Sequence, residues 1–125
     1  MRVLLVDQDP TTARALLEQL GPEAAVTTLE SVAAALALVD RERFDMVVSE
    51  LRLPGRWGDE LLAYVAARWP TTRRFLLTVD LEPERTVHDL LDLGVIHGCF
   101  AKTRADALAR AVRAFSRESR AVSSA

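Results

Sequence analysis

The sequence of 125 residues contains a single cysteine, Cys99. One cysteine excludes a disulfide bond within the chain and any metal site built from several cysteines. No apolar run reaches the roughly 18 residues that a membrane-spanning helix needs, and no signal peptide opens the chain, so we expect a cytoplasmic location and no membrane partner. The net charge is only -2, which makes direct binding to nucleic acid an unlikely function.

Lysine is almost absent from the chain. Of the 16 basic residues, Lys102 is the one lysine and the others are arginines. A bias this strong suggests that Lys102 occupies a site that needs a compact, flexible point charge, although a chance surface lysine is the alternative. Residues 101–125 carry six basic and two acidic side chains. This basic segment would suit an acidic partner, but a solvated helix face explains it more simply.

Apolar segments alternate between the patterns of strands and helices. Asp9-Pro10 and Ser31 are typical of helix starts, Pro83 begins another helix, and Gly21-Pro22, Pro70 and Gly94 mark helix ends. Five strands that alternate with five helices predict a doubly wound parallel sheet in one α/β domain. The helical periodicity ends near residue 115, so residues 116–125 are expected to be a tail or the start of a linker. The predicted strands are residues 2–6, 24–29, 45–49, 74–79 and 98–101.

Polar side chains gather where these strands end, at the edge where α/β proteins place their function. They are Asp7, Gln8 and Asp9 after the first strand, Glu50 after the third, Thr78 at the end of the fourth and Lys102 after the fifth. Carboxylates for a divalent cation, a hydroxyl and an ammonium are the parts of a phosphoryl-transfer site. Asp9 is better explained as a helix cap, and His88 and His97 as structural residues.

The motifs VDQDP, VVSELRLPGRWGDELL, LLT and FAK resemble those of the receiver domain of two-component response regulators. The resemblance covers residues 1–115 and implies a flavodoxin-like (βα)5 fold with strand order 2-1-3-4-5. The segment RWPTTRRFLLT and the spacing from Gly94 to Lys102 are most similar to receivers fused to cyclic-di-GMP phosphodiesterase or sigma-54 activator domains.

The resemblance also implies a role for individual residues. Glu50 stands at the phosphoacceptor position, where the family has Asp, and Asp7 and Gln8 stand at its acidic pair. Gln8 replaces a metal-binding Asp, so Mg²⁺, held by Asp7, Glu50 and the backbone carbonyl of Arg52, is expected to bind weakly if at all. Thr78 and Lys102 match the phosphate contacts. Cys99 stands at the aromatic switch position, Trp57 replaces a loop Asp, and Thr103 replaces a Pro.

These departures predict a pseudo-receiver, a constitutive protein-interaction module and not an enzyme. Its expected partners are a histidine kinase or an output domain, with a homodimer through the fourth helix, fifth strand and fifth helix as a further expectation. Two alternatives are a conventional phosphorylatable receiver and a haloacid-dehalogenase-type phosphatase that uses Asp7 and Asp9; a flavodoxin-like binding domain is less well supported. The interaction face would include Val87, Leu91, Cys99, Arg104, Arg110 and Arg113.

Overall fold

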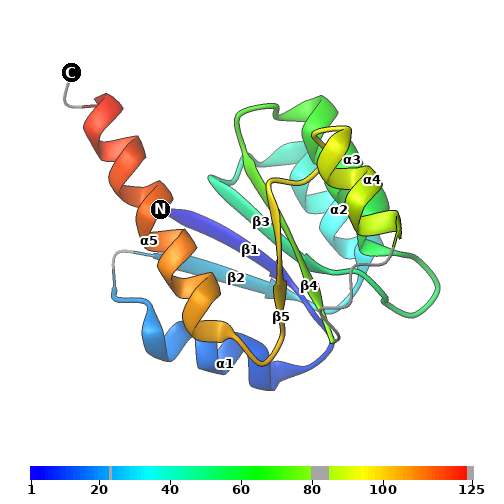
Figure 1. The fold of residues 1–125 in the computed structure, drawn as a ribbon, viewed down its shortest axis with the longest axis horizontal. Helices are drawn as coiled ribbons and strands as arrows, with labels where there is room; N and C mark the ends of the chain where they lie inside the picture. The colour runs from blue at the N-terminus through cyan, green and yellow to red at the C-terminus, as the bar shows by residue number, and fades with distance from the viewer. Residues whose placement is uncertain (23, 80–84, 124–125) are drawn as a thin grey trace.

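The computed structural model describes residues 1–22, 24–79 and 85–123, with side chains described as far as residue 117. Strands and helices alternate along the chain, as the sequence predicts (Figure 1). The strands are β1 (Arg2–Val6), β2 (Ala25–Leu29), β3 (Met46–Glu50), β4 (Arg73–Thr78) and β5 (Gly98–Ala101). The helices are α1 (Pro10–Gln19), α2 (Val32–Arg41), α3 (Gly58–Arg68), α4 (Arg85–Asp92) and α5 (Ala105–Ser123).

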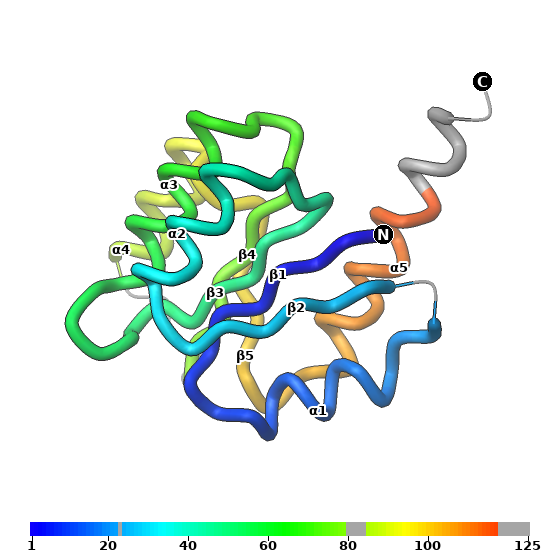
Figure 2. Tube along the Cα trace, turned by 180° about the vertical axis from the view of Figure 1, so that it is seen from behind, coloured from blue at the N-terminus to red at the C-terminus, as the bar shows by residue number. Residues whose placement is uncertain are grey.

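The five strands form one parallel sheet in the order β2-β1-β3-β4-β5. This confirms the predicted fold class and strand order. Helices α2, α3 and α4 cover one face of the sheet, and α1 and α5 cover the other (Figures 1 and 2). Because every strand runs in the same direction, all five carboxyl ends lie at one edge.

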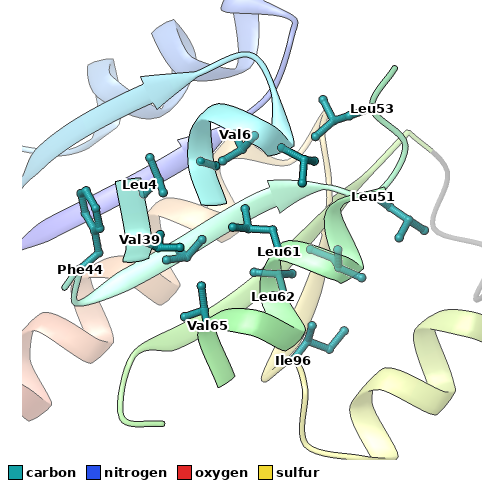
Figure 3. Close-up of a cluster of buried hydrophobic side chains, with 14 of the residues drawn as sticks. Leu4, Val6, Val39, Phe44, Leu51, Leu53, Leu61, Leu62, Val65 and Ile96 are labelled. Atoms are coloured by element: carbon teal, nitrogen blue, oxygen red, sulfur yellow. The ribbon is translucent and has the colours of Figure 1, made fainter. Parts of the chain in front are cut away.

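Two apolar layers hold the helices on the sheet. Leu4 and Val6 point from β1 toward the α2–α3 side, whereas Val3 and Leu5 point toward α1 and α5. Figure 3 shows the first layer, in which side chains of β1, α2 and α3 meet. Burial on both faces explains why the central strands are continuous apolar runs and do not alternate with polar residues.

Local sequence accounts for the helix starts. The Asp9 side chain accepts a hydrogen bond from the Thr11 amide at 2.9 Å, and Pro10 follows as the first residue of α1. The Ser31 hydroxyl accepts from the Ala34 amide at 3.1 Å at the start of α2. Both caps satisfy amides that have no partner inside the helix. Pro83, the predicted start of the fourth helix, lies outside the described residues.

The boundaries differ from the sequence prediction in four places. Strand β2 begins at Ala25, one residue later than predicted. Strand β3 is displaced by one residue from 45–49, so Glu50 is its last residue and pairs with Leu77 of β4. Strand β4 is displaced in the other direction, and Val79 lies exposed beyond it. Helix α5 continues to Ser123, past the predicted boundary at 115, so no break in secondary structure separates the domain from residues 116–123.

Candidate functional site

The parallel topology brings the predicted polar residues to one edge of the sheet. Asp7 follows β1, Glu50 ends β3, and Lys102 follows β5. Strands β1, β3, β4 and β5 are successive neighbours, which places these residues around one crevice. The side chains of Asp7, Glu50 and Lys102 are 1%, 9% and 13% exposed, respectively, so the three charged groups meet out of contact with most of the solvent.

The ammonium of Lys102 joins the two carboxylates. Lys102 Nζ lies 2.9 Å from Asp7 Oδ1 and 3.3 Å from Glu50 Oε1. Asp7 Oδ1 also accepts a hydrogen bond from the Asp9 amide at 2.8 Å. Lysine suits this position because its charge lies at the end of a flexible stem and can serve two acceptors from different strands. The inference that the single lysine occupies a specific polar site therefore agrees with the geometry.

Each carboxylate keeps one oxygen without a partner. Among the described residues, Asp7 Oδ2 and Glu50 Oε2 are buried and receive no hydrogen bond. Burial, together with the nearby carboxylate of Asp7, raises the pKa of Glu50, and Lys102 only partly opposes this effect. For Lys102, burial lowers the pKa, but the two carboxylates outweigh it and the net pKa is raised. The ammonium therefore stays charged, whereas Glu50 is the group most easily neutralised.

Gln8 and Asp9 do not join this cluster. Gln8 is exposed, and Asp9 is exposed and caps α1. The hydrogen bond from Thr11 lowers the pKa of Asp9, so it remains an ionised cap. This geometry does not match the general acid/base that a phosphatase would need beside Asp7, because the Asp9 side chain is used by the helix start.

The residues of the crevice fit Mg²⁺ poorly. Mg²⁺ needs near-octahedral oxygen ligands, commonly with one or two carboxylates. Within residues 1–22, 24–79 and 85–117, no group of three or more His, Cys, Asp or Glu side chains could hold a metal ion. The two carboxylates that remain, Asp7 and Glu50, already share the ammonium of Lys102, which a cation would have to displace. Asp7 Oδ2 and Glu50 Oε2 could serve as metal ligands. Two carboxylates that already share an ammonium would nevertheless bind a divalent cation weakly.

Thr78 and Cys99 contact each other and not the charged cluster. Thr78 Oγ1 lies 3.7 Å from Cys99 Sγ, within the distance of a weak hydrogen bond to sulfur. The connection between Thr78 and Lys102 is through the backbone, where the Lys102 amide donates to the Thr78 carbonyl at 2.9 Å. Burial raises the pKa of the Cys99 thiol, so it is a neutral partner for the hydroxyl.

Gly58 and Ser49 support the position of Glu50, and the sequence did not single them out as site residues. The Ser49 hydroxyl donates to the Glu50 carbonyl at 2.9 Å. The first turn of α3 packs directly on this strand end, because a Cβ on Gly58 would clash with the Glu50 carbonyl oxygen and lie 2.5 Å from Ser49 Oγ. The glycine was visible in the sequence only as a loop residue, since a close approach between backbones leaves no local pattern.

The loop between β3 and α3 carries an exposed aromatic ring. Trp57 is 48% exposed, and the guanidinium of Arg52 lies 5.6 Å from the centre of its ring. Arg52 and Trp57 also form an isolated antiparallel bridge, which closes the loop. Trp57 thus stacks with Arg52 and supplies no carboxylate to the crevice.

The predicted interaction face is only partly assembled as expected. Arg104 and Arg110 both pair with Asp106, at 3.0 and 3.7 Å. Leu91 is exposed on α4, Cys99 is half-buried, and Val87 is buried in the core. Placing Arg113 on this face was wrong, because Arg113 Nη1 donates to the Gln19 carbonyl at 3.0 Å and therefore faces α1. Arg110 and Arg113 are three residues apart and therefore lie close together on α5.

Across the described part of the chain, no helix has the length and apolar character required to cross a membrane.

Two curated bacterial proteins are similar to this chain in sequence. The hydrogenase transcriptional regulatory protein HoxA of Cupriavidus necator is 30% identical over 93 residues, which are 74% of this chain and 19% of HoxA. The response regulator protein FleR of Pseudomonas aeruginosa is 34% identical over 89 residues, which are 69% of this chain and 18% of FleR. The chain thus spans less than a fifth of the length of these relatives.

Solved structures agree with the sequence relatives. The signal receiver domain of an HD domain-containing protein from Pseudomonas fluorescens superposes with a TM-score of 0.81 at 26% identity, covering 98% of this chain and 91% of that one. The beryllofluoride-activated DrrB receiver domain gives a TM-score of 0.78 at 25% identity, with coverages of 93% and 97%. The family model described as the response regulator receiver domain matches residues 3–113. With this match over most of its length, the chain belongs to the response regulator receiver domain family.

Proposed function

We propose that this receiver domain is a pseudo-receiver, a signalling module that is not phosphorylated at the end of β3. The observation that carries the proposal is the ammonium of Lys102, which binds Asp7 Oδ1 and Glu50 Oε1 together. One oxygen of each carboxylate is occupied, and the other, Asp7 Oδ2 or Glu50 Oε2, is buried. An acceptor for phosphoryl transfer needs a carboxylate oxygen that the incoming group can reach in line.

The length of glutamate is a second argument for this proposal. One added methylene carries the carboxylate about 1.5 Å farther than aspartate would, and a displacement of about 1 Å in a preorganised site can cost about 10²-fold in rate. Glu50 uses this reach to contact Lys102, which follows the edge strand β5, two strands away from β3.

The metal position supports the same interpretation. Gln8 brings no charge, and the cluster of Asp7, Glu50 and Lys102 has a net charge of about -1 when both acids are ionised. Mg²⁺ ordinarily neutralises the oxygens of a transferring phosphoryl group. We therefore expect Mg²⁺ binding to be weak, and no other cofactor is expected.

The proposed role is a constitutive protein-interaction module in the cytoplasm, with no enzymatic activity. A histidine kinase or an output domain would be the partner, and a homodimer would use α4, β5 and α5. Thr78 contacts Cys99, whose small side chain cannot move between two positions as an aromatic ring does. The oligomeric state measured by light scattering should therefore be the same with and without beryllofluoride and Mg²⁺. A change in association of more than about tenfold, or about 1.4 kcal/mol of coupling, would contradict this.

The proposal is tested by incubating the protein with acetyl phosphate and Mg²⁺ and measuring its intact mass. We expect no stable addition of a phosphoryl group. The matched control is the double variant Gln8→Asp with Glu50→Asp, which restores the acid pair and the shorter acceptor and should gain one phosphoryl group. A stoichiometric adduct on the unchanged protein, mapped to Glu50 or Asp7, would show that the domain is a conventional phosphorylatable receiver.

A further inference from the structure

A second polar site lies at the opposite edge of the molecule, between the end of α1 and the middle of α5. It is a pocket of about 160 Å³. Its apolar lining includes Met1, Leu20, Ala24 and Val112, and its polar lining is Arg113, Ser116 and Arg117. Helix α5 passes the amino terminus here (Figure 1), and the lining residues come from the end of α1, the start of β2 and the middle of α5.

The volume of the pocket matches one apolar side chain. An apolar cavity of about 150 Å³ holds a benzene molecule. Leu20 and Val112 are buried in the core beneath the pocket, so an inserted group would meet well-packed apolar atoms. An apolar anchor that fills such a pocket, with polar groups at its rim, is the usual arrangement at the centre of a protein interface.

Of the two arginines of the pocket, Arg113 makes one hydrogen bond to the end of α1, and Arg117 makes none with a described residue. Arg113 and Arg117 are both exposed and are four residues apart on α5, where like charges oppose helix formation. Helix α5 ends at Ser123, so neither arginine lies in the last turn, where the helix dipole would favour a positive charge. None of the described residues that line the pocket is acidic.

Arg110 shows the contrast. It pairs with Asp106, one turn before it on α5, and Asp106 also pairs with Arg104, which precedes the helix. The unneutralised charge of α5 within residues 105–117 is therefore concentrated beside the pocket. Guanidinium groups bind carboxylates strongly because two parallel N–H groups match two oxygens.

We propose that this pocket docks an acidic segment of a partner protein, which inserts one apolar side chain and places carboxylates on Arg113 and Arg117. A protein segment is favoured over nucleic acid because the pocket has an apolar floor and no aromatic ring in its lining, whereas single strands are bound by stacking on aromatic rings. The proposal is independent of the pseudo-receiver function, since the pocket and the crevice of Glu50 lie at opposite edges of the sheet.

The experiment measures binding of a fluorescent peptide in which one leucine is flanked by two glutamates on each side. Anisotropy with the unchanged protein, at low salt and without Mg²⁺ or acetyl phosphate, should show saturable binding with a Kd below about 1 mM. Replacing the central leucine of the peptide by alanine should weaken binding at least fivefold. Absence of saturation at several millimolar peptide, or equal binding of the alanine peptide, would overturn the proposal.

Variants of the protein locate the site. Arg117→Gln removes no contact between described residues, and it should weaken peptide binding severalfold; together with Arg113→Gln the loss should reach about tenfold or more. Arg110→Gln is the matched control, with the same loss of charge on the same helix but outside the pocket, and it should change binding less than twofold. An equal loss of peptide affinity in Arg110→Gln would show a general anion surface and overturn the peptide site. The same conclusion would follow if a thymidine oligonucleotide bound more tightly than the peptide and the double variant lost that binding as well.

Discussion

Removing the ammonium of Lys102 should destabilise the domain, whereas removing the charge of Glu50 should not. In Lys102→Met, Asp7 and Glu50 would be two nearly buried carboxylates without a cation. Breaking a buried pair by removing one partner commonly costs about 3–5 kcal/mol. Glu50 can take up a proton in place of the lost charge, since burial and Asp7 already raise its pKa. We therefore expect the low end of the range, a loss of about 3 kcal/mol at neutral pH.

Glu50→Gln has the opposite expectation. The amide offers an acceptor to Lys102 and a donor to Asp7, whose Oδ2 has no partner among the described residues. Replacing a carboxylate whose charged form is disfavoured by burial should leave the free energy of unfolding unchanged within about 0.5 kcal/mol, or raise it. In the double variant, Glu50→Gln should recover part of the cost of Lys102→Met, because only one buried carboxylate then remains.

Urea denaturation checks both variants. For an m-value of about 1–3 kcal/mol/M, a loss of about 3 kcal/mol lowers the midpoint by at least about 1 M. The pH dependence of the free energy of unfolding is an independent check. Because the pKa of Glu50 is raised on folding above its usual 4.5, the folded state binds the proton more tightly, and this stabilisation is lost as pH rises from 4.5 through the folded pKa. Glu50→Gln should remove that loss. Equal destabilisation by the two single variants would refute the reasoning.

Three further predictions concern other residues. Gly58→Ala should cost about 1–3 kcal/mol, because its Cβ would clash with the Glu50 carbonyl, whereas Gly21→Ala, with open space around it, should be nearly neutral in urea denaturation. Burial, Arg74 and Arg73 lower the pKa of His97, so the free energy of unfolding should fall as the pH drops below 6.5, where the unfolded chain binds the proton first. His97→Asn, which keeps an acceptor for the Arg74 amide, should reduce this pH dependence, and His88→Asn is the control. An unchanged pH profile in His97→Asn would contradict the prediction. Calorimetry should give a Kd for Mg²⁺ above about 1 mM, and the double variant Gln8→Asp with Glu50→Asp should lower this Kd at least tenfold. Micromolar binding of Mg²⁺ by the unchanged protein would contradict this prediction.

The sequence was sufficient to predict the fold and the central cluster. Continuous apolar runs indicated strands buried on both faces, and parallel strands necessarily place their carboxyl ends at one edge. The pattern therefore placed Asp7, Glu50 and Lys102 at that edge, and the strand order implied by the resemblance to receiver domains brought them together, although they are far apart in the chain. The scarcity of lysine singled out Lys102 before any contact was known.

Interactions between distant backbone segments could not be predicted in the same way. Arg74 is in a predicted strand, yet its buried guanidinium donates to the carbonyls of Pro70, Thr72, Gly94 and Val95. These acceptors come from two loops that meet only in the folded chain. The same holds for Gly58 against Glu50, which depends on how closely α3 approaches β3.

Side-chain direction was the other quantity that the sequence left open. Thr78 was predicted at the end of its strand, but its contact with Cys99 depends on the twist and register of β4 and β5. Arg113 was assigned to the wrong side of α5 because the helical pattern fixes which residues share a stripe and not which neighbour each stripe meets. The helix also outlasts its apolar stripe, so loss of periodicity did not mark its end.

The central claim is that the domain, with Lys102 bound to Asp7 and Glu50, accepts no phosphoryl group and stays in one arrangement. It is tested most directly by recording backbone amide chemical shifts of the unchanged protein with and without beryllofluoride and Mg²⁺, in parallel with the variant Gln8→Asp with Glu50→Asp. We predict no shift changes around Thr78, Cys99 and Lys102 in the unchanged protein, and clear changes there in the variant. Shift changes in the unchanged protein that saturate and extend from Glu50 to Cys99 would contradict the account.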